Sequence, residues 1–246
     1  MLNNKIILIS GATSGIGREL ALTCAKNQAT VIALGKNKKK LEKLYDDINN
    51  LGEVPEPVLL PFNLAGANPQ DYQDLALEIA ARFNKLDGLV HNAATLGTKT
   101  ELIHYDILKW YETLQVNLNA PFLLTKALLP ILKLAKQASI VFTTANEGMH
   151  GQSYQGAYGV SKAGINNFMQ ILASELETHT HIRVNSVNPN KVYSGIYNQN
   201  FPATDPHTLP SVEDIMPLYI KLLGDFSEKL HGLTFKFNGT EEYTTL

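Results

Sequence analysis

The chain has 246 residues, which fits one large α/β domain better than two small ones. Its formal net charge of −2 gives no overall attraction to nucleic acid, and no apolar run reaches the roughly 18 residues that a membrane span requires. We therefore expect neither nucleic acid nor a membrane as a partner.

The N-terminal residues and the single cysteine indicate the cellular compartment in which the protein is expected. Residues 1–5 run straight into a strand-like segment and lack the layout of a signal peptide, so we expect no export. The single cysteine, Cys24, cannot form an internal disulfide, which agrees with a reducing cytoplasm. Because Cys24 lies within a helical pattern, we interpret it as a small buried side chain and not as a catalytic thiol.

Short apolar runs alternate with longer periodic segments along the chain, and several of the short runs are apolar on both faces. Such runs are typical of strands in a parallel sheet that helices cover on each side. The predicted strands are 5–10, 30–34, 58–62, 86–91, 139–143, 183–187 and 234–237. The predicted helices are 16–26, 38–49, 69–83, 105–134 with a break, 156–178 and 212–223.

This alternation predicts an α/β protein: a single-domain Rossmann fold over residues 1–246, with a doubly wound, mostly parallel seven-stranded sheet and helices on both faces. In such sheets, ligands bind beyond the carboxyl ends of the strands, where the strand order reverses. The loop 198–211, which holds three prolines, is the least regular internal stretch. Because it follows the sixth predicted strand, it could cover a bound substrate.

The first predicted strand ends in the run Ser10-Gly11-Ala12-Thr13-Ser14-Gly15-Ile16-Gly17. Gly11 permits a tight turn, Gly15 lets the backbone approach a pyrophosphate, and Gly17 lets the helix pack close to the sheet. The amide groups at the start of that helix would face the phosphates. Glycines also mark ordinary turns, but their place between a strand and a helix favours a dinucleotide-binding loop.

The second predicted strand runs into Gly35-Lys36-Asn37. Enzymes that prefer NAD usually carry a carboxylate at this position for the ribose hydroxyls. This chain has no Asp or Glu there, and Lys36 can neutralise a 2′-phosphate. We therefore favour NADP(H) over NAD(H), and we interpret most of the lysine run that follows as a solvated helix face.

Tyr158 and Lys162 are four residues apart within a helical pattern, so their side chains share one face. A nearby ammonium favours the phenolate of a tyrosine, whose pKa is ordinarily about 10. Such a pair can exchange a proton with a substrate oxygen while a nicotinamide exchanges a hydride. The spacing is common on helix surfaces, but its place after the fifth strand of a dinucleotide-binding fold favours a catalytic role.

Together these motifs resemble the short-chain dehydrogenase/reductase family over essentially the full chain. Residues 10–17 match the TGxxxGxG loop of the family, Tyr158 and Lys162 match its YxxxK pair, and residues 91–94 match its NNAG element. Asn117 corresponds to the family's catalytic asparagine, which implies a proton relay through a bound water. The segments 89–97, 201–206 and 214–225 further resemble the bacterial YciK-like oxidoreductases.

The resemblance implies a catalytic set, a cofactor set and no metal. The catalytic set is Tyr158, Lys162, Asn117 and, beside the position of a missing serine, Thr144. The cofactor set is Gly11, Thr13, Ser14, Gly15, Ile16, Gly17, Lys36, Asn63, Leu64, Asn92, Ala93, Ala94, Tyr158, Lys162, Pro189, Val192 and Ser194.

The missing serine is the main departure from the family. The serine that polarises the substrate oxygen corresponds to Ala145, whose methyl group cannot donate a hydrogen bond. Thr144 is adjacent, but consecutive strand residues point to opposite faces, so Thr144 could replace the serine only after a local shift. Four milder departures are Asn63, Ala94, Asn190 and Ser194. Asn190 stands for a glycine, and asparagine tolerates a positive φ better than most residues do.

Two functions remain open. The first is an NADP(H)-dependent oxidoreductase that interconverts a carbonyl and an alcohol on a small molecule, with Tyr158 as the acid/base. The second is a catalytically impaired dinucleotide-binding protein with a non-enzymatic or regulatory role, which Ala145 favours. The substrate and the direction of the reaction are not encoded in these motifs.

Two further expectations concern the pocket and the assembly. Met149, His150, Tyr154 and Tyr193 are candidate pocket positions, although packing in the core or at the rim explains each equally well. The family resemblance implies a homodimer or homotetramer through the helices around Asn117 and Tyr158.

Overall fold

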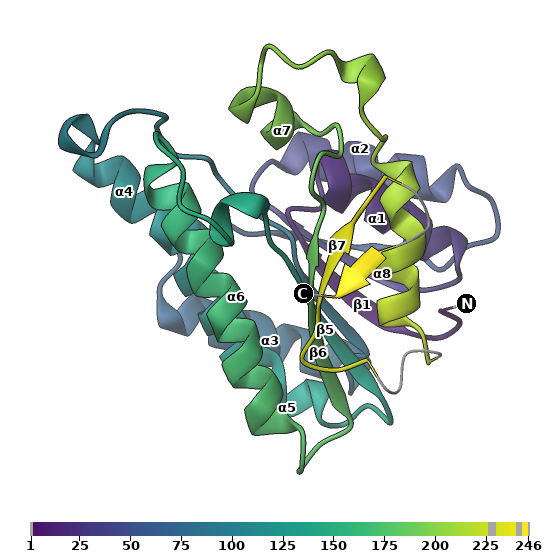
Figure 1. Cartoon of the computed structure of the whole chain (residues 1–246). Helices are drawn as coiled ribbons and strands as arrows, with labels where there is room; N and C mark the ends of the chain where they lie inside the picture. The colour runs from purple at the N-terminus through teal and green to yellow at the C-terminus, as the bar shows by residue number, and fades with distance from the viewer. Residues whose placement is uncertain (1, 226–229, 240–242, 246) are drawn as a thin grey trace.

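One sheet runs through the chain in the order β3-β2-β1-β4-β5-β6-β7-β8 (Figure 1). The computed structural model describes residues 2–225, 230–239 and 243–245, so the predicted domain ends, residues 1 and 246, lie outside the described part. The strands are β1 (Ile6–Ser10), β2 (Thr30–Gly35), β3 (Val58–Pro61), β4 (Gly88–His91), β5 (Ala138–Thr143), β6 (Ile182–Asn188), β7 (Thr234–Phe237) and β8 (Tyr243–Thr245).

Strands β1 to β7 pair in parallel, and β8 pairs antiparallel with β7. The seven parallel strands confirm the predicted doubly wound Rossmann sheet. The short β8 is an addition that the apolar pattern did not predict. The strand order reverses between β1 and β4, so this is the place where a ligand is expected.

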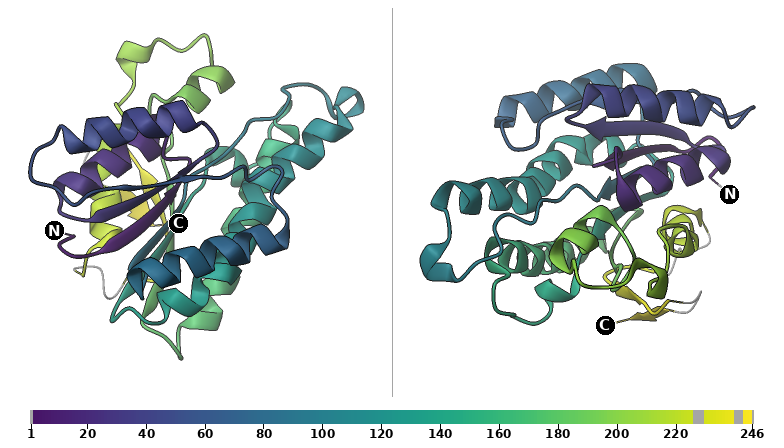
Figure 2. Two further views of the ribbon diagram at one scale, coloured as in Figure 1. Left: turned by 180° about the vertical axis from the view of Figure 1, so that it is seen from behind. Right: turned by 90° about the horizontal axis from the view of Figure 1, so that it is seen from above.

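Helices cover both faces of the sheet, as Figure 2 shows from behind and from above. They are α1 (Gly15–Lys26), α2 (Lys38–Asn49), α3 (Pro69–Phe83), α4 (Ile107–Leu114), α5 (Ala120–Leu132), α6 (Gly156–Leu176), α7 (Gly195–Asn200) and α8 (Met216–Leu223). Helix α1 packs against α2 and α8, whereas α3 packs against α5 on the other face. Within the described ranges, no helix combines the length and the apolar character that crossing a membrane requires.

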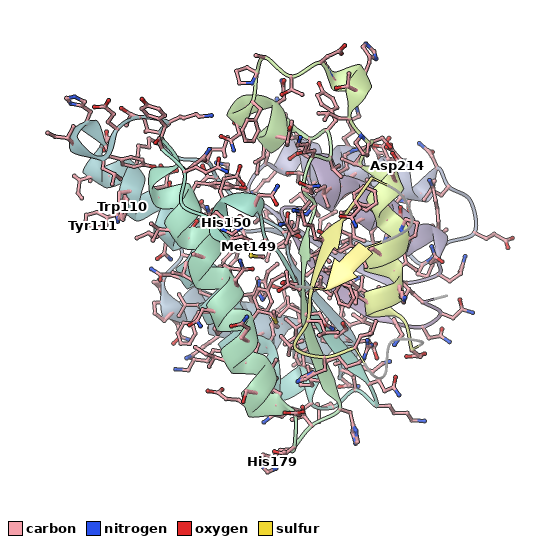
Figure 3. All side chains as sticks on the ribbon, in the orientation of Figure 1. Trp110, Tyr111, Met149, His150, His179 and Asp214 are labelled. Atoms are coloured by element: carbon pink, nitrogen blue, oxygen red, sulfur yellow. The ribbon has the colours of Figure 1, made fainter. Side chains whose placement is uncertain are left out.

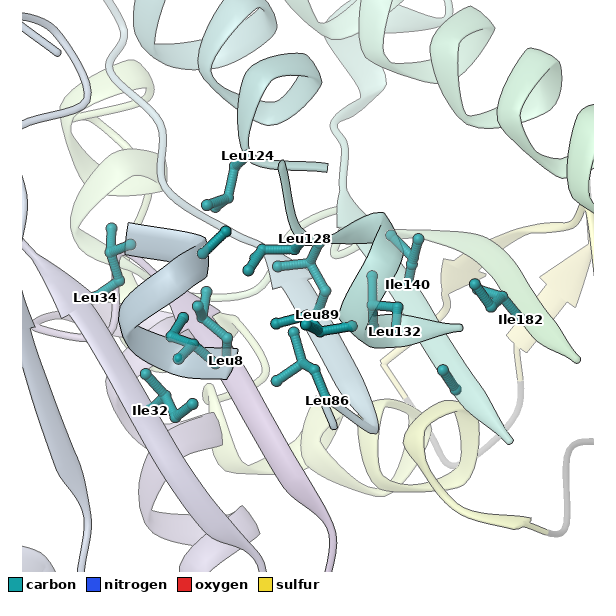
Figure 4. Packing of buried hydrophobic residues seen from close by; sticks show 14 of the residues in the cluster. Leu8, Ile32, Leu34, Leu86, Leu89, Leu124, Leu128, Leu132, Ile140 and Ile182 are labelled. Carbon is teal, nitrogen blue, oxygen red and sulfur yellow. The ribbon is translucent and has the colours of Figure 1, made fainter. Parts of the chain in front are cut away.

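Two apolar clusters hold these layers together. On one face, leucines of α5 pack with leucines and isoleucines of the sheet (Figure 4). Leu8 and Leu89 of the sheet and Leu128 of α5 are all fully buried. On the other face, the cluster joins Leu20 of α1 with Leu222 of α8. Each such buried leucine contributes about 1.5–3 kcal/mol, and the clusters fix the sheet whose strand ends carry the site.

The predicted break in helix 105–134 is confirmed. The chain forms α4, then a π-helical turn over Gln115–Asn119, and then α5. Pro121 has no backbone N–H for the carbonyl of Asn117 four residues earlier, which disfavours a regular α-helix at this point. The predicted loop 198–211 also differs in detail, because its first residues belong to α7.

Candidate active site

The carboxyl ends of the strands open into a cavity of about 860 Å³ at the point where the strand order reverses. Its lining comes from the turn after β1, the end of β2, and the segments that follow β4, β5 and β6. Every residue of the predicted cofactor set lines it except Gly17, and every residue of the predicted catalytic set lines it except Asn117. The sequence motifs, which are far apart along the chain, therefore meet in one cavity.

The glycine turn after β1 has the shape that a pyrophosphate needs. Gly11 and Gly15 have φ values of 68° and 51°, a left-handed region that favours glycine. A Cβ on Gly11 would lie 2.7 Å from Cα of Ala93, whereas a Cβ on Gly15 would have only Cβ of Ser194, at 3.7 Å, nearby. Gly15 therefore leaves open a cradle at the N-terminus of α1 that a side chain would fill, and this fits the phosphates of a dinucleotide.

Gly17 has a structural role behind this cradle. A Cβ on Gly17 would collide with the side chain of Asn92 and with the carbonyl oxygen of Gly11. Gly17 therefore allows the close packing that was expected, and the groups packed against it are the side chain of Asn92 and the backbone of Gly11. Ser10 joins the same loops, because its Oγ accepts hydrogen bonds from the backbone N–H groups of Asn92 (3.1 Å) and Ala93 (3.2 Å).

Two lysines line the cavity beside the end of β2. Lys36 is exposed there, and Lys40 in the first turn of α2 lines the same part of the cavity. The side chain of Asn37 caps α2 by accepting a hydrogen bond from the backbone N–H of Lys40 (3.1 Å). Lys40 was not among the predicted cofactor residues, because the lysine run was interpreted mostly as a solvated helix face; Lys36 precedes α2, so no helical spacing relates the two lysines.

Tyr158 and Lys162 lie buried on α6, and their exposed fractions are 5% and 4%. The Nζ of Lys162 donates a hydrogen bond to the carbonyl oxygen of Thr143 (2.8 Å) and lies 5.7 Å from the ring centroid of Tyr158. Burial raises the pKa of Tyr158, and the negative charge of Glu147 raises it further. This is opposite to the direction expected from the Lys162 ammonium, because desolvation of the buried phenolate is the largest effect on Tyr158. Burial also lowers the pKa of Lys162 to about 8.

Thr144 and Ala145 follow the last residue of β5 and both line the cavity. The Oγ1 of Thr144 is buried and has no hydrogen-bond partner in the part of the chain that the structure describes. The hydroxyl of the preceding Thr143 is already engaged, since it shares a hydrogen bond with the hydroxyl of Tyr219 (2.8 Å). Thr144 therefore carries the uncommitted hydroxyl next to the position of the missing serine.

Asn117 lies behind the cavity, in the π-helical turn. Its Oδ1 accepts a hydrogen bond from the backbone N–H of Thr95 (2.8 Å), and its Nδ2 donates to the carbonyl oxygen of Thr95 (2.9 Å) and to Oγ of Ser161 (3.0 Å). These bonds tie the loop after β4 to α6. The Asn117 side chain thus positions two segments of the site, and its part in a proton relay stays a prediction.

None of the candidate pocket positions Met149, His150, Tyr154 and Tyr193 lines the cavity, so of the two explanations left open for them, packing in the core or at the rim holds. Met149 and His150 lie beside α6 (Figure 3), where the sulfur of Met149 contacts Nδ2 of Asn166 at 3.5 Å. The cavity wall beyond Tyr158 comes instead from Glu147, Gln152, Tyr197, Gln199, Asn200 and Phe201. Among the described residues, no group of His, Cys, Asp and Glu side chains is suited to hold a metal.

Comparison with known proteins places this site in a family. Residues 5–204 match the family model of the short chain dehydrogenases. The chain belongs to the short-chain dehydrogenase/reductase family. It is 41% identical over 236 residues to the uncharacterized oxidoreductase YciK of Escherichia coli K12, which covers 96% of this chain and 92% of YciK. The predicted resemblance to YciK-like oxidoreductases is therefore confirmed, and the chain is an oxidoreductase of this family.

Two solved structures are similar in both sequence and fold. A short chain dehydrogenase from Escherichia coli CFT073, complexed with NADPH, has a TM-score of 0.91 at 41% identity, with 96% of this chain and 97% of that chain covered. A short chain dehydrogenase from Shigella flexneri 2a, complexed with NADP, has a TM-score of 0.90 at 40% identity, with the same coverage of 96% and 97%. The cavity at the strand ends thus belongs to a fold that binds a nicotinamide dinucleotide.

Proposed function

We propose that this oxidoreductase uses NADP(H) to interconvert a carbonyl and an alcohol on a small molecule. One observation carries the proposal: the acid/base candidate Tyr158 lines the same cavity as the open cradle at Gly15 and the lysines Lys36 and Lys40. Two positive charges beside the end of β2 suit a 2′-phosphate, and the similar structures hold NADP and NADPH. A reducing cytoplasm remains the expected compartment, since Cys24 is a buried free thiol.

Each of the residues at the reacting end has a distinct task. Tyr158, whose raised pKa keeps the phenol protonated at neutral pH, donates a proton to a carbonyl oxygen. Thr144 carries the uncommitted hydroxyl beside Ala145, and it can donate to the same oxygen in place of the absent serine once its buried Oγ1 turns toward the cavity. Lys162, held by the carbonyl of Thr143, binds the cofactor ribose. The bound cofactor supplies the hydride, and Gly11, Gly15 and the start of α1 hold its phosphates.

The first prediction tests Tyr158 as the proton donor. Incubation with NADPH and a panel of aldehydes, ketones and quinones should show cofactor oxidation with at least one of them. Tyr158→Phe should then lower kcat by at least about a hundredfold, the usual contribution of a positioned acid, with NADPH affinity nearly unchanged. Turnover that survives in Tyr158→Phe would assign the proton to another group. Tight NADPH binding without turnover on any substrate would favour the non-enzymatic alternative that Ala145 raises.

We also infer that the protein self-associates as a homodimer or homotetramer. Helices α4 and α6 pack against each other, and both expose large apolar side chains. Apolar side chains gathered on a surface mark contact sites between proteins.

A further inference from the structure

Glu147 places a carboxylate in the substrate end of the cavity. It lies in the turn Asn146–Gly148, two residues after Ala145, and it lines the cavity although the residue is only 8% exposed. Its Oε1 accepts a hydrogen bond from Nδ2 of Asn200 (2.9 Å). No hydrogen bond to Oε2, and no ion pair of Glu147, occurs within residues 2–225, 230–239 and 243–245. One carboxylate oxygen is therefore held, and the other is available.

The protein holds this carboxylate in a fixed orientation. The Oδ1 of Asn200 accepts hydrogen bonds from Nε2 of Gln155 (3.2 Å) and from Nζ of Lys99 (3.2 Å). Because both donors reach the same amide oxygen, the amide nitrogen of Asn200 faces Glu147. These contacts connect the loop after β4, the start of α6 and the end of α7 around one carboxylate. A group that three further segments hold in place is suited to select a ligand.

The charge of Glu147 is not neutralised by a direct ion pair within the described residues. It acts on Tyr158 and Lys162, since it raises the pKa of both side chains. The Lys162 ammonium, however, donates to the carbonyl oxygen of Thr143 and makes no ion pair with Glu147. A buried carboxylate with one hydrogen bond and no ion pair is unfavourable unless a bound group supplies further donors. That group would lie close to Tyr158, where the substrate reacts.

We propose that Glu147 determines substrate specificity: the preferred substrate is a carbonyl compound that carries a hydrogen-bond donor, best an ammonium group, near the reacting carbonyl. This inference rests on the proposed carbonyl–alcohol chemistry at Tyr158. A substrate that carries a carboxylate at the same place is rejected, because like charges repel in a desolvated site. Tyr197 and Phe201, whose rings lie 5.0 Å apart, form an aromatic wall of the same cavity.

Four aromatic ketones of similar shape test this preference. They are α-aminoacetophenone, α-hydroxyacetophenone, propiophenone and phenylglyoxylate, which place a cation, a neutral donor, a methyl group and an anion beside the carbonyl. With NADPH, kcat/KM should fall in that order, and the cationic ketone should exceed propiophenone at least about tenfold, as for one hydrogen bond to a charged group. Equal values for these two ketones in the unmodified protein would overturn the inference.

Substitutions then test whether the preference for the cationic ketone comes from the Glu147 carboxylate. Glu147→Gln keeps an oxygen for Asn200 and removes the charge, so it should lower the ratio of the two ketones at least about tenfold. Lys99→Met loosens the contacts around Asn200 but keeps the carboxylate, so the preference should persist. The matched control is Glu112→Gln, because Glu112 also lines the cavity but is already paired with Lys109 (2.7 Å). An unchanged ratio in Glu147→Gln contradicts a direct role of Glu147.

A binding measurement separates failure of this inference from failure of the proposed function. If no ketone is reduced, the proposed reaction fails, and calorimetry with NADP⁺-loaded protein still compares the affinities for α-aminoacetophenone and propiophenone. Tighter binding of the cationic ketone that disappears in Glu147→Gln supports the role of Glu147 without any turnover. Equal affinities for the two ketones reject it.

Discussion

The first residue-scale prediction is that Lys36 and Lys40, which line the cavity beside Gly35, distinguish NADP(H) from NAD(H). Lys36→Ala should weaken NADPH binding about tenfold or more, because a hydrogen bond to a charged group contributes about 1.5–3 kcal/mol. NADH binding should stay nearly the same, since NADH has no 2′-phosphate. Fluorescence titration of both cofactors measures the effect, and Lys38→Ala, a neighbouring lysine outside the cavity, is the control. Equal NADPH and NADH affinities in the unmodified protein would contradict the predicted preference.

A second residue-scale prediction concerns the donor that replaces the missing serine. The Oγ1 of Thr144 is buried without a partner among the described residues, beside Ala145. Removal of one preorganised donor typically costs about a hundredfold to a thousandfold in kcat, so Thr144→Val should lose at least about a hundredfold. Ala145→Ser alone should change kcat/KM little, but in the Thr144→Val background it should restore much of the loss. A Thr144→Val variant with full activity would show that neither position supplies the donor.

At the residue scale, functional residues within short sequence motifs could be predicted. Contacts between residues that are far apart in the sequence could not. Gly15 and Tyr158 belong to local patterns whose spacing has a physical meaning, and both line the cavity as expected. Glu147 and Asn200 meet only because the turn after β5 and the end of α7 come together, which no sequence spacing reveals. For the same reason the sequence left Met149 open between the pocket and packing, and its side chain packs on α6 instead of lining the cavity.

At the scale of elements, the sequence predicted best those strands whose burial produces a clear run of apolar residues. The parallel strands are apolar on both faces, so their runs stood out, and their predicted bounds lie within two residues of the observed ones. The edge strand β8 has only three residues and one neighbour, β7, so it is too short to give a recognisable apolar run. The break between α4 and α5 was predictable as a break, but its π-helical form depends on the missing N–H of Pro121.

The junction of β4 with α5 makes stability depend on pH. His91 at the end of β4 shares a hydrogen bond with Oγ1 of Thr125 on α5 (2.8 Å) and stacks on Phe142 (4.7 Å between ring centroids). Burial lowers the pKa of His91 to about 3 from 6.5. Between these values the unfolded chain binds a proton that the folded chain does not, so stability is full above pH 6.5 and falls as the pH is lowered.

The expected slope is measurable by chemical denaturation at several pH values. This single group contributes up to about 1.4 kcal/mol of unfolding free energy per pH unit. His91→Gln retains a hydrogen-bonding side chain without a titrating ring, so the slope between about pH 4 and 6 should become shallower by that amount. His179→Gln is the control, because this exposed histidine has similar surroundings in the folded and unfolded chain. The same slope in His91→Gln and in the unmodified protein would show that other groups dominate.

At the scale of the whole molecule, the strand order explains why one cavity collects so many distant residues. Chain connections run in opposite directions from β1 and β4, so the loops after these strands separate and leave room between them. The lysines after β2 then lie at one end of the cavity, and the wall of Glu147, Tyr197 and Phe201 lies at the other. We therefore expect substitutions at the lysines to change the cofactor preference, and substitutions at Glu147 to change the substrate preference, independently of each other.

The last prediction concerns the assembly of whole chains. Helix α4 projects beyond the sheet (Figure 1), and its residues Leu108 and Tyr111 are 72% and 61% exposed. A stable interface buries about 800 Å² per partner, and large apolar side chains supply most of its binding energy. Sedimentation velocity should therefore give a mass of two or four times 27.1 kDa.

Leu108→Asp combined with Tyr111→Asp should give the monomer. The control is Leu77→Asp, at an equally exposed position on α3 (67%), which should leave the mass unchanged. A monomeric unmodified protein would rule out the assembly, and dissociation by Leu77→Asp alone would move the interface to α3.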